Sequence, residues 1–94
     1  MKLLVTYDVC TVDKAGERRL RRVARACEDY GVRVQKSVFE CTLGETDWVL
    51  LRTRLLAEMD EKQDSLRIYY LGLDIRIEHH GSAKPIDLTA PLII

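Results

Sequence analysis

Residues 31–40 alternate polar and apolar side chains, as a strand with two chemically different faces does. The polar side chains belong to Arg33, Gln35 and Ser37, and most of the apolar ones are valines. Because side chains on one face of a strand can act together on a ligand, three neighbouring hydrogen-bond donors predict an anion-binding face. The alternation breaks at Lys36 and again three residues later. We therefore expect a bulge, a bend or a division into two strands in this segment.

A carboxylate follows the first apolar stretch of the chain. Residues 3–7 are β-branched or apolar at both odd and even positions, which predicts a central strand buried on two faces and ending at Asp8. There the carboxylate could meet a cation, although an acid that bonds the backbone of its own turn is the commoner role for such a position. Magnesium takes an octahedron of oxygen ligands, for which one carboxylate is not enough. A twofold dimer with Asp8 near its axis would supply two, so we expect any metal to be shared by the dimer.

Positive charge is concentrated in the first half of a chain whose formal net charge is zero. A cluster of five arginines lies between residues 18 and 25, and such an asymmetry creates a local field that attracts phosphates. A merely solvated helix face is the alternative. We favour contacts to the nucleic-acid backbone, which carry no base specificity. The residues expected to make these contacts are Arg18, Arg19, Arg22, Arg25 and Arg33.

Ser37, His79 and His80 carry weaker signals. A serine becomes a nucleophile only beside a base, and the two histidines of the chain lie far from Ser37 in the sequence. Adjacent side chains of an extended segment point to opposite sides, so the two histidines cannot easily hold one metal together. We expect them to be exposed polar residues. Phe39 is expected in the core, where a strand phenylalanine usually lies.

The order of the helix and strand patterns predicts the fold that positions these residues. Strands are expected at residues 3–7, within 31–40, and at residues 39–43, 66–71 and 75–78. One helix is capped by Thr11 or Asp13 and ends before Gly31, and a second covers residues 47–62. Their apolar stripes consist of Leu20, Val23, Ala24, Cys27 and Tyr30 in the first helix and Trp48, Leu51, Leu55 and Met59 in the second. This is the α+β, ferredoxin-like βαββαβ pattern of an antiparallel sheet with an extra C-terminal strand, and we place this domain at residues 1–80.

Residues 81–94 form a tail that is unusually apolar for the end of a chain. Chain ends are commonly polar and frayed, so an apolar tail packs on its own domain or adds to the sheet edge of a neighbour. We favour the neighbour.

Composition narrows the class of protein. Ninety-four residues with 47% hydrophobic content predict one folded domain whose small core would gain from a partner, so we expect an oligomer. No apolar run approaches the roughly 18 residues that span a bilayer, and a charge comes too early for a signal peptide, so we expect a cytoplasmic protein without membrane contact. Cys10, Cys27 and Cys41 show no C-x-x-C spacing, which favours buried or half-buried thiols over disulfides or a zinc site.

Four segments together resemble the family of CRISPR-associated protein two, the small subunit that works beside the CRISPR integrase in spacer acquisition. They are Tyr7-Asp8, the Arg-rich helix ending in Tyr30-Gly31, the run Arg33-Val34-Gln35-Lys36-Ser37-Val38-Phe39-Glu40, and Asp64-Ser65-Leu66-Arg67-Ile68-Tyr69. Their order and spacing match over essentially the whole chain, and the run over 33–40 is the most specific part. The tail is similar to versions from type I-C loci.

The resemblance implies a homodimer in which the C-terminal strand of one subunit joins the sheet of the other, together with an integrase partner. It also implies a magnesium-dependent endonuclease acting on RNA or double-stranded DNA, with Asp8 holding the metal between the subunits. The residues at positions that support this site in the family are Arg22, Arg33, Ser37 and Phe39.

Two functions fit these expectations. In one, a metal held by two Asp8 carboxylates activates water for phosphodiester cleavage. In the other, the dimer is a scaffold that binds duplex DNA and bridges integrase dimers. We favour the scaffold because the sequence offers one convincing carboxylate, no general base and many arginines. Outside the family, a toxin-like ribonuclease or a small-molecule sensing module can share this fold, although a sensing module would not need the arginine cluster.

Overall fold

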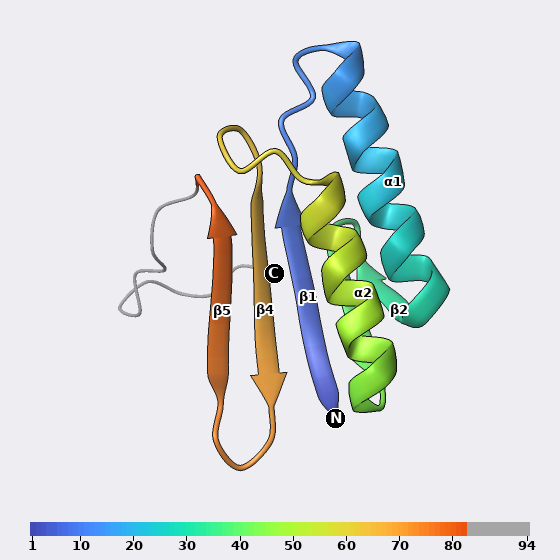
Figure 1. Cartoon of the computed structure of the whole chain (residues 1–94), viewed down its shortest axis with the longest axis vertical. Coiled ribbons are helices and arrows are strands. Elements are labelled where there is room, and N and C mark those ends of the chain that lie inside the picture. Colours follow the sequence, from blue (N-terminus) through green and yellow to red (C-terminus); the bar gives the residue numbers. More distant parts are fainter. Residues whose placement is uncertain (83–94) are drawn as a thin grey trace.

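A five-stranded antiparallel sheet carries two helices on one of its faces (Figure 1). The computed structural model describes residues 1–82. Its elements are β1 (Lys2–Asp8), α1 (Lys14–Tyr30), β2 (Val32–Gln35), β3 (Val38–Thr42), α2 (Glu45–Glu58), β4 (Ser65–Leu71) and β5 (Arg76–Gly81). The α+β fold with ferredoxin-like βαββαβ order and an extra strand is thus confirmed. The predicted docking of the tail lies outside the described residues.

The central strand of the sheet is β1. The strand order is β2-β3-β1-β4-β5, so β1 is hydrogen bonded to β3 on one side and to β4 on the other. Pairing with β3 extends only to Thr6, whereas pairing with β4 extends to Asp8, which lies opposite Ser65. The backbone of Asp8 is therefore held by β4.

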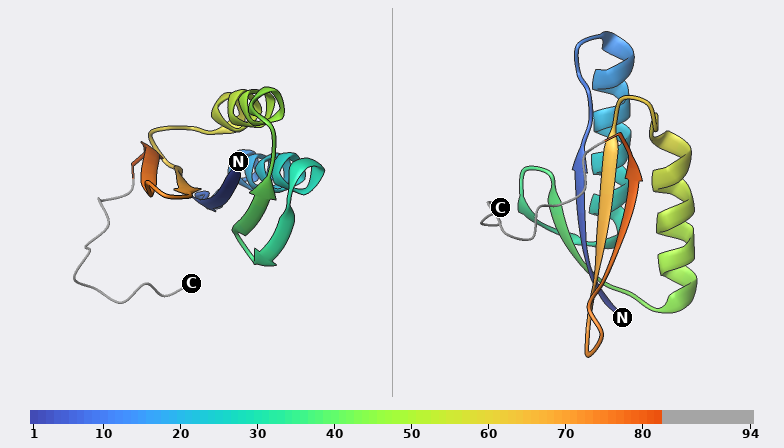
Figure 2. Two further views of the ribbon diagram at one scale, coloured as in Figure 1. Left: turned by 90° about the horizontal axis from the view of Figure 1, so that it is seen from below. Right: turned by 90° about the vertical axis from the view of Figure 1, so that its left-hand side faces the viewer.

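The hydrophobic core lies between the sheet and the helices. Leu3, Val5 and Tyr7 of β1 are buried there, together with residues of every element except β2 and β5. Both helices lie on the same side of the sheet (Figure 2). The expected burial of β1 on two faces is therefore wrong, and Leu4 and Thr6 on its helix-free face are only half-buried.

Both ends of α1 match the sequence signals. The Asp13 carboxylate accepts a hydrogen bond from the Gly16 N–H at 2.8 Å, which satisfies one of the free N–H groups of the first turn. At the other end the Gly31 N–H donates to the Cys27 carbonyl at 2.8 Å. A side chain at position 31 would lie 2.5 Å from the Cys41 sulfur, so the glycine permits close packing on β3.

The second helix is shorter than predicted. It buries Trp48, Leu51 and Leu55 as expected but ends at Glu58 instead of residue 62. Just beyond it the Asp60 carboxylate accepts a hydrogen bond from the Lys62 N–H at 2.9 Å. A local bond between an aspartate and the following backbone stabilises a turn in place of a further helical turn. Neither helix within residues 1–82 is long and apolar enough to cross a bilayer.

The break expected within residues 31–40 is confirmed as a hairpin in which Lys36 and Ser37 separate β2 from β3. A bulge between Arg33 and Gln35 shifts the register, so Arg33 lies opposite Phe39 and Gln35 lies opposite Val38. Neighbouring residues of a strand point to opposite faces, and the predicted polar face is therefore wrong.

Alternating apolar side chains usually bury one face of a strand, but the valines of β2 are exposed. Val32 and Val34 are 69% and 47% exposed, because β2 is an edge strand and its helix-free side is not covered by α1 or α2.

Gly81 provides a test of the fold. Its φ of 107° favours glycine, and a Cβ at this position would collide with the Asp64 carbonyl oxygen. We expect Gly81→Ala to lower the free energy of unfolding by about 2–4 kcal/mol in urea titrations. Gly72→Ala is the control, because nothing lies within 4 Å of a Cβ at that position. Equal effects of the two substitutions would contradict the described backbone.

Candidate functional site

A buried carboxylate, Asp64, joins the loops at one end of the sheet. Its side chain is inaccessible to solvent. It accepts hydrogen bonds from Arg19 Nε at 2.9 Å, from the Asp60 N–H at 2.9 Å and from the Cys10 N–H at 3.0 Å. Its backbone carbonyl accepts a further bond from the Ser82 N–H at 3.0 Å. Asp64 thereby connects α1, the loop after β1, the loop after α2 and the end of β5.

Asp64 remains ionised in this interior position. Burial alone would raise its pKa, but the hydrogen bonds from Arg19 and from two backbone N–H groups outweigh burial and hold the pKa below its usual value. The arginine cluster predicts a nucleic-acid contact for Arg19, whereas the structure places its guanidinium on Asp64. Arg19 lies between Gly16 and Val23 at the spacing of the buried stripe, and that position was the available signal for an interior role.

We call Asp64 and its hydrogen-bond partners Arg19, Asp60 and Cys10 the Asp64 clamp. Asp8 lies close to this clamp in the sheet, but it faces solvent. It is exposed, and it lies opposite Ser65, the neighbour of Asp64. Since Leu3, Val5 and Tyr7 face the helices, the alternation of β1 puts Asp8 on the helix-free face.

The described residues of a single chain do not form a metal site by themselves. Among residues 1–82, no three His, Cys, Asp or Glu side chains gather closely enough to hold an ion. Asp8 offers one carboxylate, which would leave most of the magnesium octahedron to water. Asp8 side chains from two copies of the chain would fit this ion better.

Three other predicted site residues gather around Tyr7, the neighbour of Asp8. The Ser37 carbonyl accepts a hydrogen bond from the Tyr7 N–H at 3.1 Å. The fully buried Phe39 ring stacks on the Tyr7 ring at a centroid distance of 6.2 Å, and the Arg33 guanidinium lies 4.9 Å from the Phe39 centroid. The core location of Phe39 is confirmed, and from there it can position Asp8 but cannot touch a surface ligand.

The predicted arginines differ in how firmly they are paired with acidic side chains. Arg33 donates to Glu28 Oε1 at 2.9 Å and to the Lys36 carbonyl at 3.0 Å. Arg22 forms a looser pair with Glu58 at 3.6 Å and its side chain is 67% exposed. The exposed arginines of α1 are Arg18, Arg21, Arg22 and Arg25.

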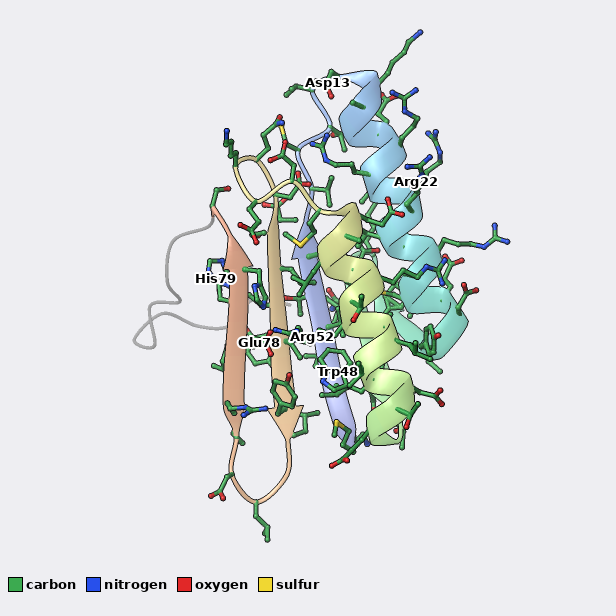
Figure 3. The ribbon with its side chains drawn as sticks, viewed as in Figure 1. Asp13, Arg22, Trp48, Arg52, Glu78 and His79 are labelled. Carbon is green, nitrogen blue, oxygen red and sulfur yellow. The ribbon has the colours of Figure 1, made fainter. Side chains whose placement is uncertain are left out.

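A second polar cluster, which no sequence pattern indicates, joins α2 to β5 (Figure 3). The Glu78 carboxylate lies 2.6 Å from Arg52 Nη2 and 2.5 Å from His80 Nε2, and it accepts a hydrogen bond from the Tyr70 hydroxyl at 2.7 Å. Burial would raise the pKa of Glu78, but these hydrogen bonds hold it at about 2. His80 is half-buried in the cluster, so the expectation of exposed histidines is right for His79 and wrong for His80.

The cysteines occupy the predicted environments. Cys27 and Cys41 are buried and Cys10 is half-buried, and all three are free thiols. Burial raises the pKa of the Cys27 thiol to about 12, so this side chain stays protonated and unreactive.

The fold and these side chains define a small ferredoxin-like protein with a basic helix and a carboxylate at the end of its central strand. Residues 1–74 match the family model described as CRISPR associated protein Cas2. The chain therefore belongs to the Cas2 family.

Individual relatives agree with this assignment. The chain is 55% identical to the "CRISPR-associated endoribonuclease Cas2" of Chlorobaculum tepidum, with all of both chains covered. It is 50% identical to the "CRISPR-associated endonuclease Cas2" of Halalkalibacterium halodurans, with 99% of each chain covered. Among solved structures, Cas2 of Streptococcus pyogenes at pH 6.5 matches with a TM-score of 0.70 and 54% identity, covering 77% of this chain and 87% of that one.

The Asp64 clamp predicts a large response to loss of one charge. Asp64→Asn keeps the shape but leaves Arg19 without its anion, and we expect the free energy of unfolding to fall by about 3–5 kcal/mol. Asp29→Asn is a matched control, because the Asp29–Arg54 pair is exposed and its loss costs about 1 kcal/mol or less.

The same clamp predicts a dependence on pH. The pKa of Asp64 is lower in the folded state than in the unfolded state, so its contribution is present above the unfolded pKa and is lost as the pH falls through the folded pKa. Below pH 5, the free energy of unfolding should fall less with decreasing pH in Asp64→Asn than in the unmodified protein, as measured by denaturant titrations at several pH values. Parallel pH curves would contradict this role of Asp64.

Proposed function

We propose that this chain forms a homodimer that binds duplex DNA and holds the CRISPR integrase during spacer acquisition, with the cytoplasm as its compartment. One observation carries the proposal. The exposed arginines belong to α1 in the helix layer, whereas Asp8 faces the helix-free side of the sheet. The exposed arginines and the Asp8 side chain therefore lie on opposite sides of the sheet layer, which favours a binding role for the arginines over a direct role in cleavage at Asp8.

The helix-free face of the sheet supports dimerisation. Leu4, Tyr69 and Ile77 lie side by side across β1, β4 and β5, and Ile77 is 44% exposed. A row of apolar and aromatic side chains on an uncovered sheet face is suited to burial against a second sheet. Asp8 ends the same face, so an isologous contact there would bring two Asp8 carboxylates towards each other.

Magnesium is the ion that best suits such a pair of carboxylates, with water completing the octahedron. When bound, it would supply positive charge at a phosphodiester and lower the pKa of a bound water. In this proposal the protein contributes the position of Asp8, which the Asp8–Ser65 pairing and the Tyr7–Ser37 hydrogen bond hold in place.

The second candidate function is phosphodiester cleavage at the paired Asp8 site. The printed names of the relatives, endoribonuclease and endonuclease, favour it. Ser37 lies beside this end of β1 and would bind a flanking phosphate in that case, whereas Arg33 lies with Phe39 on the helix-facing side and is bonded to Glu28. We rank cleavage below scaffolding because the described residues that lie level with Asp8 across β4 and β5, Ser65 and Gly81, offer no general base. Because the chain belongs to the Cas2 family, the functions of a toxin-like ribonuclease or a small-molecule sensing module are no longer needed to account for this fold.

Residues 81–94 are proposed to complete the assembly as the tail that contacts the partner subunit or the integrase. Gly81 pairs with Ser65, and the Ser82 N–H donates a hydrogen bond to the Asp64 carbonyl. The first two residues of this segment are therefore held against the start of β4.

Removing Arg18 and Arg22 together tests the DNA-binding role. The double variant Arg18→Ala, Arg22→Ala should weaken duplex binding and reduce the slope of log K against log salt by about 2 for each subunit that contacts the duplex, since each lost phosphate contact removes about 0.9. Fluorescence anisotropy at several salt concentrations measures both quantities. The control is Lys62→Ala, Arg76→Ala, which removes the same charge from exposed residues outside α1. An unchanged slope in the α1 variant would remove this helix from the binding surface.

A further inference from the structure

The arginines of α1 do not act on an isolated helix surface, because α2 runs beside α1 on the same side of the sheet (Figure 1). A pocket of about 320 Å³ opens between the two helices. We call it the interhelical pocket, and the residues that line it are Arg21, Arg22, Arg25, Arg54 and Glu58. Two of these residues, Arg54 and Glu58, come from α2.

The interhelical pocket has a surplus of positive charge. Four guanidinium groups line it against the single carboxylate of Glu58. That carboxylate lies 3.6 Å from Arg22, a longer separation than the 2.7 Å between Arg54 and Asp29, which lies outside the pocket. Among the ion pairs of residues 1–82, none involves Arg21 or Arg25. The pocket therefore offers several unneutralised donors to an anion.

The spacing of these donors fits a chain of phosphates. Arg18, Arg21, Arg22 and Arg25 stand at positions i, i+3, i+4 and i+7 and form a stripe about 10 Å long on α1. The planar guanidinium group binds phosphate oxygens in pairs and suits the phosphodiester backbone better than a point charge does. Arg54 faces the stripe from α2, so a phosphate entering the pocket would be held from two helices.

We propose that the interhelical pocket is a built phosphate site that grips the backbone of one nucleic-acid strand, with Arg54 as the contact from α2. Glu58 and Asp29 limit the affinity of this site by competing with phosphate for Arg22 and Arg54, respectively. The inference rests on the proposed DNA-binding function and extends it to Arg21, Arg54 and Glu58. The basic surface of α1 is then one side of a groove between two helices, and one nucleic-acid strand has a defined position in this groove.

Opposite changes in the pocket test the proposal. Arg54→Ala should lower duplex affinity about tenfold, as expected for a lost charge-assisted hydrogen bond, and should reduce the salt slope by about 0.9. Glu58→Gln should raise the affinity, because it frees Arg22 for phosphate. Both are measured by fluorescence anisotropy on the full chain, after thermal melts have verified that the variants are folded.

Matched controls separate the pocket from a general charge effect. Arg76→Ala is the control for Arg54→Ala, because it removes a positive charge from an exposed position on β5. Glu45→Gln is the control for Glu58→Gln, because it removes a negative charge at the far end of α2, about 20 Å along the helix axis from Glu58. The proposal is overturned if the pocket variants behave like these controls while the α1 variant still loses affinity. If the α1 variant also behaves like its control, the proposed DNA-binding function itself fails.

Discussion

The structure depends most on the burial of one charge. Asp64 lies entirely inside the protein, where an ionised carboxylate is stable only if its oxygens are fully hydrogen bonded. Arg19 and the backbone of Cys10 and Asp60 provide those bonds. Because these partners come from three different segments, the carboxylate fixes the start of α1 and the loops around it in one arrangement. A buried ion pair stabilises a fold little more than apolar residues in its place would, but removing one partner leaves an unpaired buried charge and is strongly destabilising. All members of the Asp64 clamp are therefore needed together.

This constraint also sets the geometry of function. Asp64 directly precedes β4, whose first residue pairs with Asp8, and Arg19 belongs to the helix that carries the exposed arginines. The Asp64 clamp thus fixes the position of the Asp8 carboxylate on the helix-free face relative to the arginines of α1 in the helix layer. A dimer built on the helix-free face would leave the basic stripes of both copies accessible. That arrangement suits a protein that presents DNA to a partner enzyme.

Much of the fold followed from patterns in the sequence, because periodicity reports which side of an element is buried. The order of elements, the Asp13 cap and the core position of Phe39 were predicted in this way. Three features were not. A bulge was one expectation for the break at Lys36, but the observed bulge lies beside Arg33, where its register shift moves side chains to the other face in a way that alternation does not encode. The end of α2 depends on a local bond of Asp60, and the pairing of Arg19 with Asp64 joins residues 45 positions apart.

The central claim is that binding by the arginines, and not chemistry at Asp8, is what spacer acquisition requires from this chain. The most direct measurement is spacer acquisition in cells that carry Asp8→Ala as the only form of the protein, with dimerisation of the purified variant checked by ultracentrifugation. We expect acquisition to persist at the level of the unmodified protein. Loss of acquisition by a variant that still dimerises and still binds duplex DNA would contradict the account.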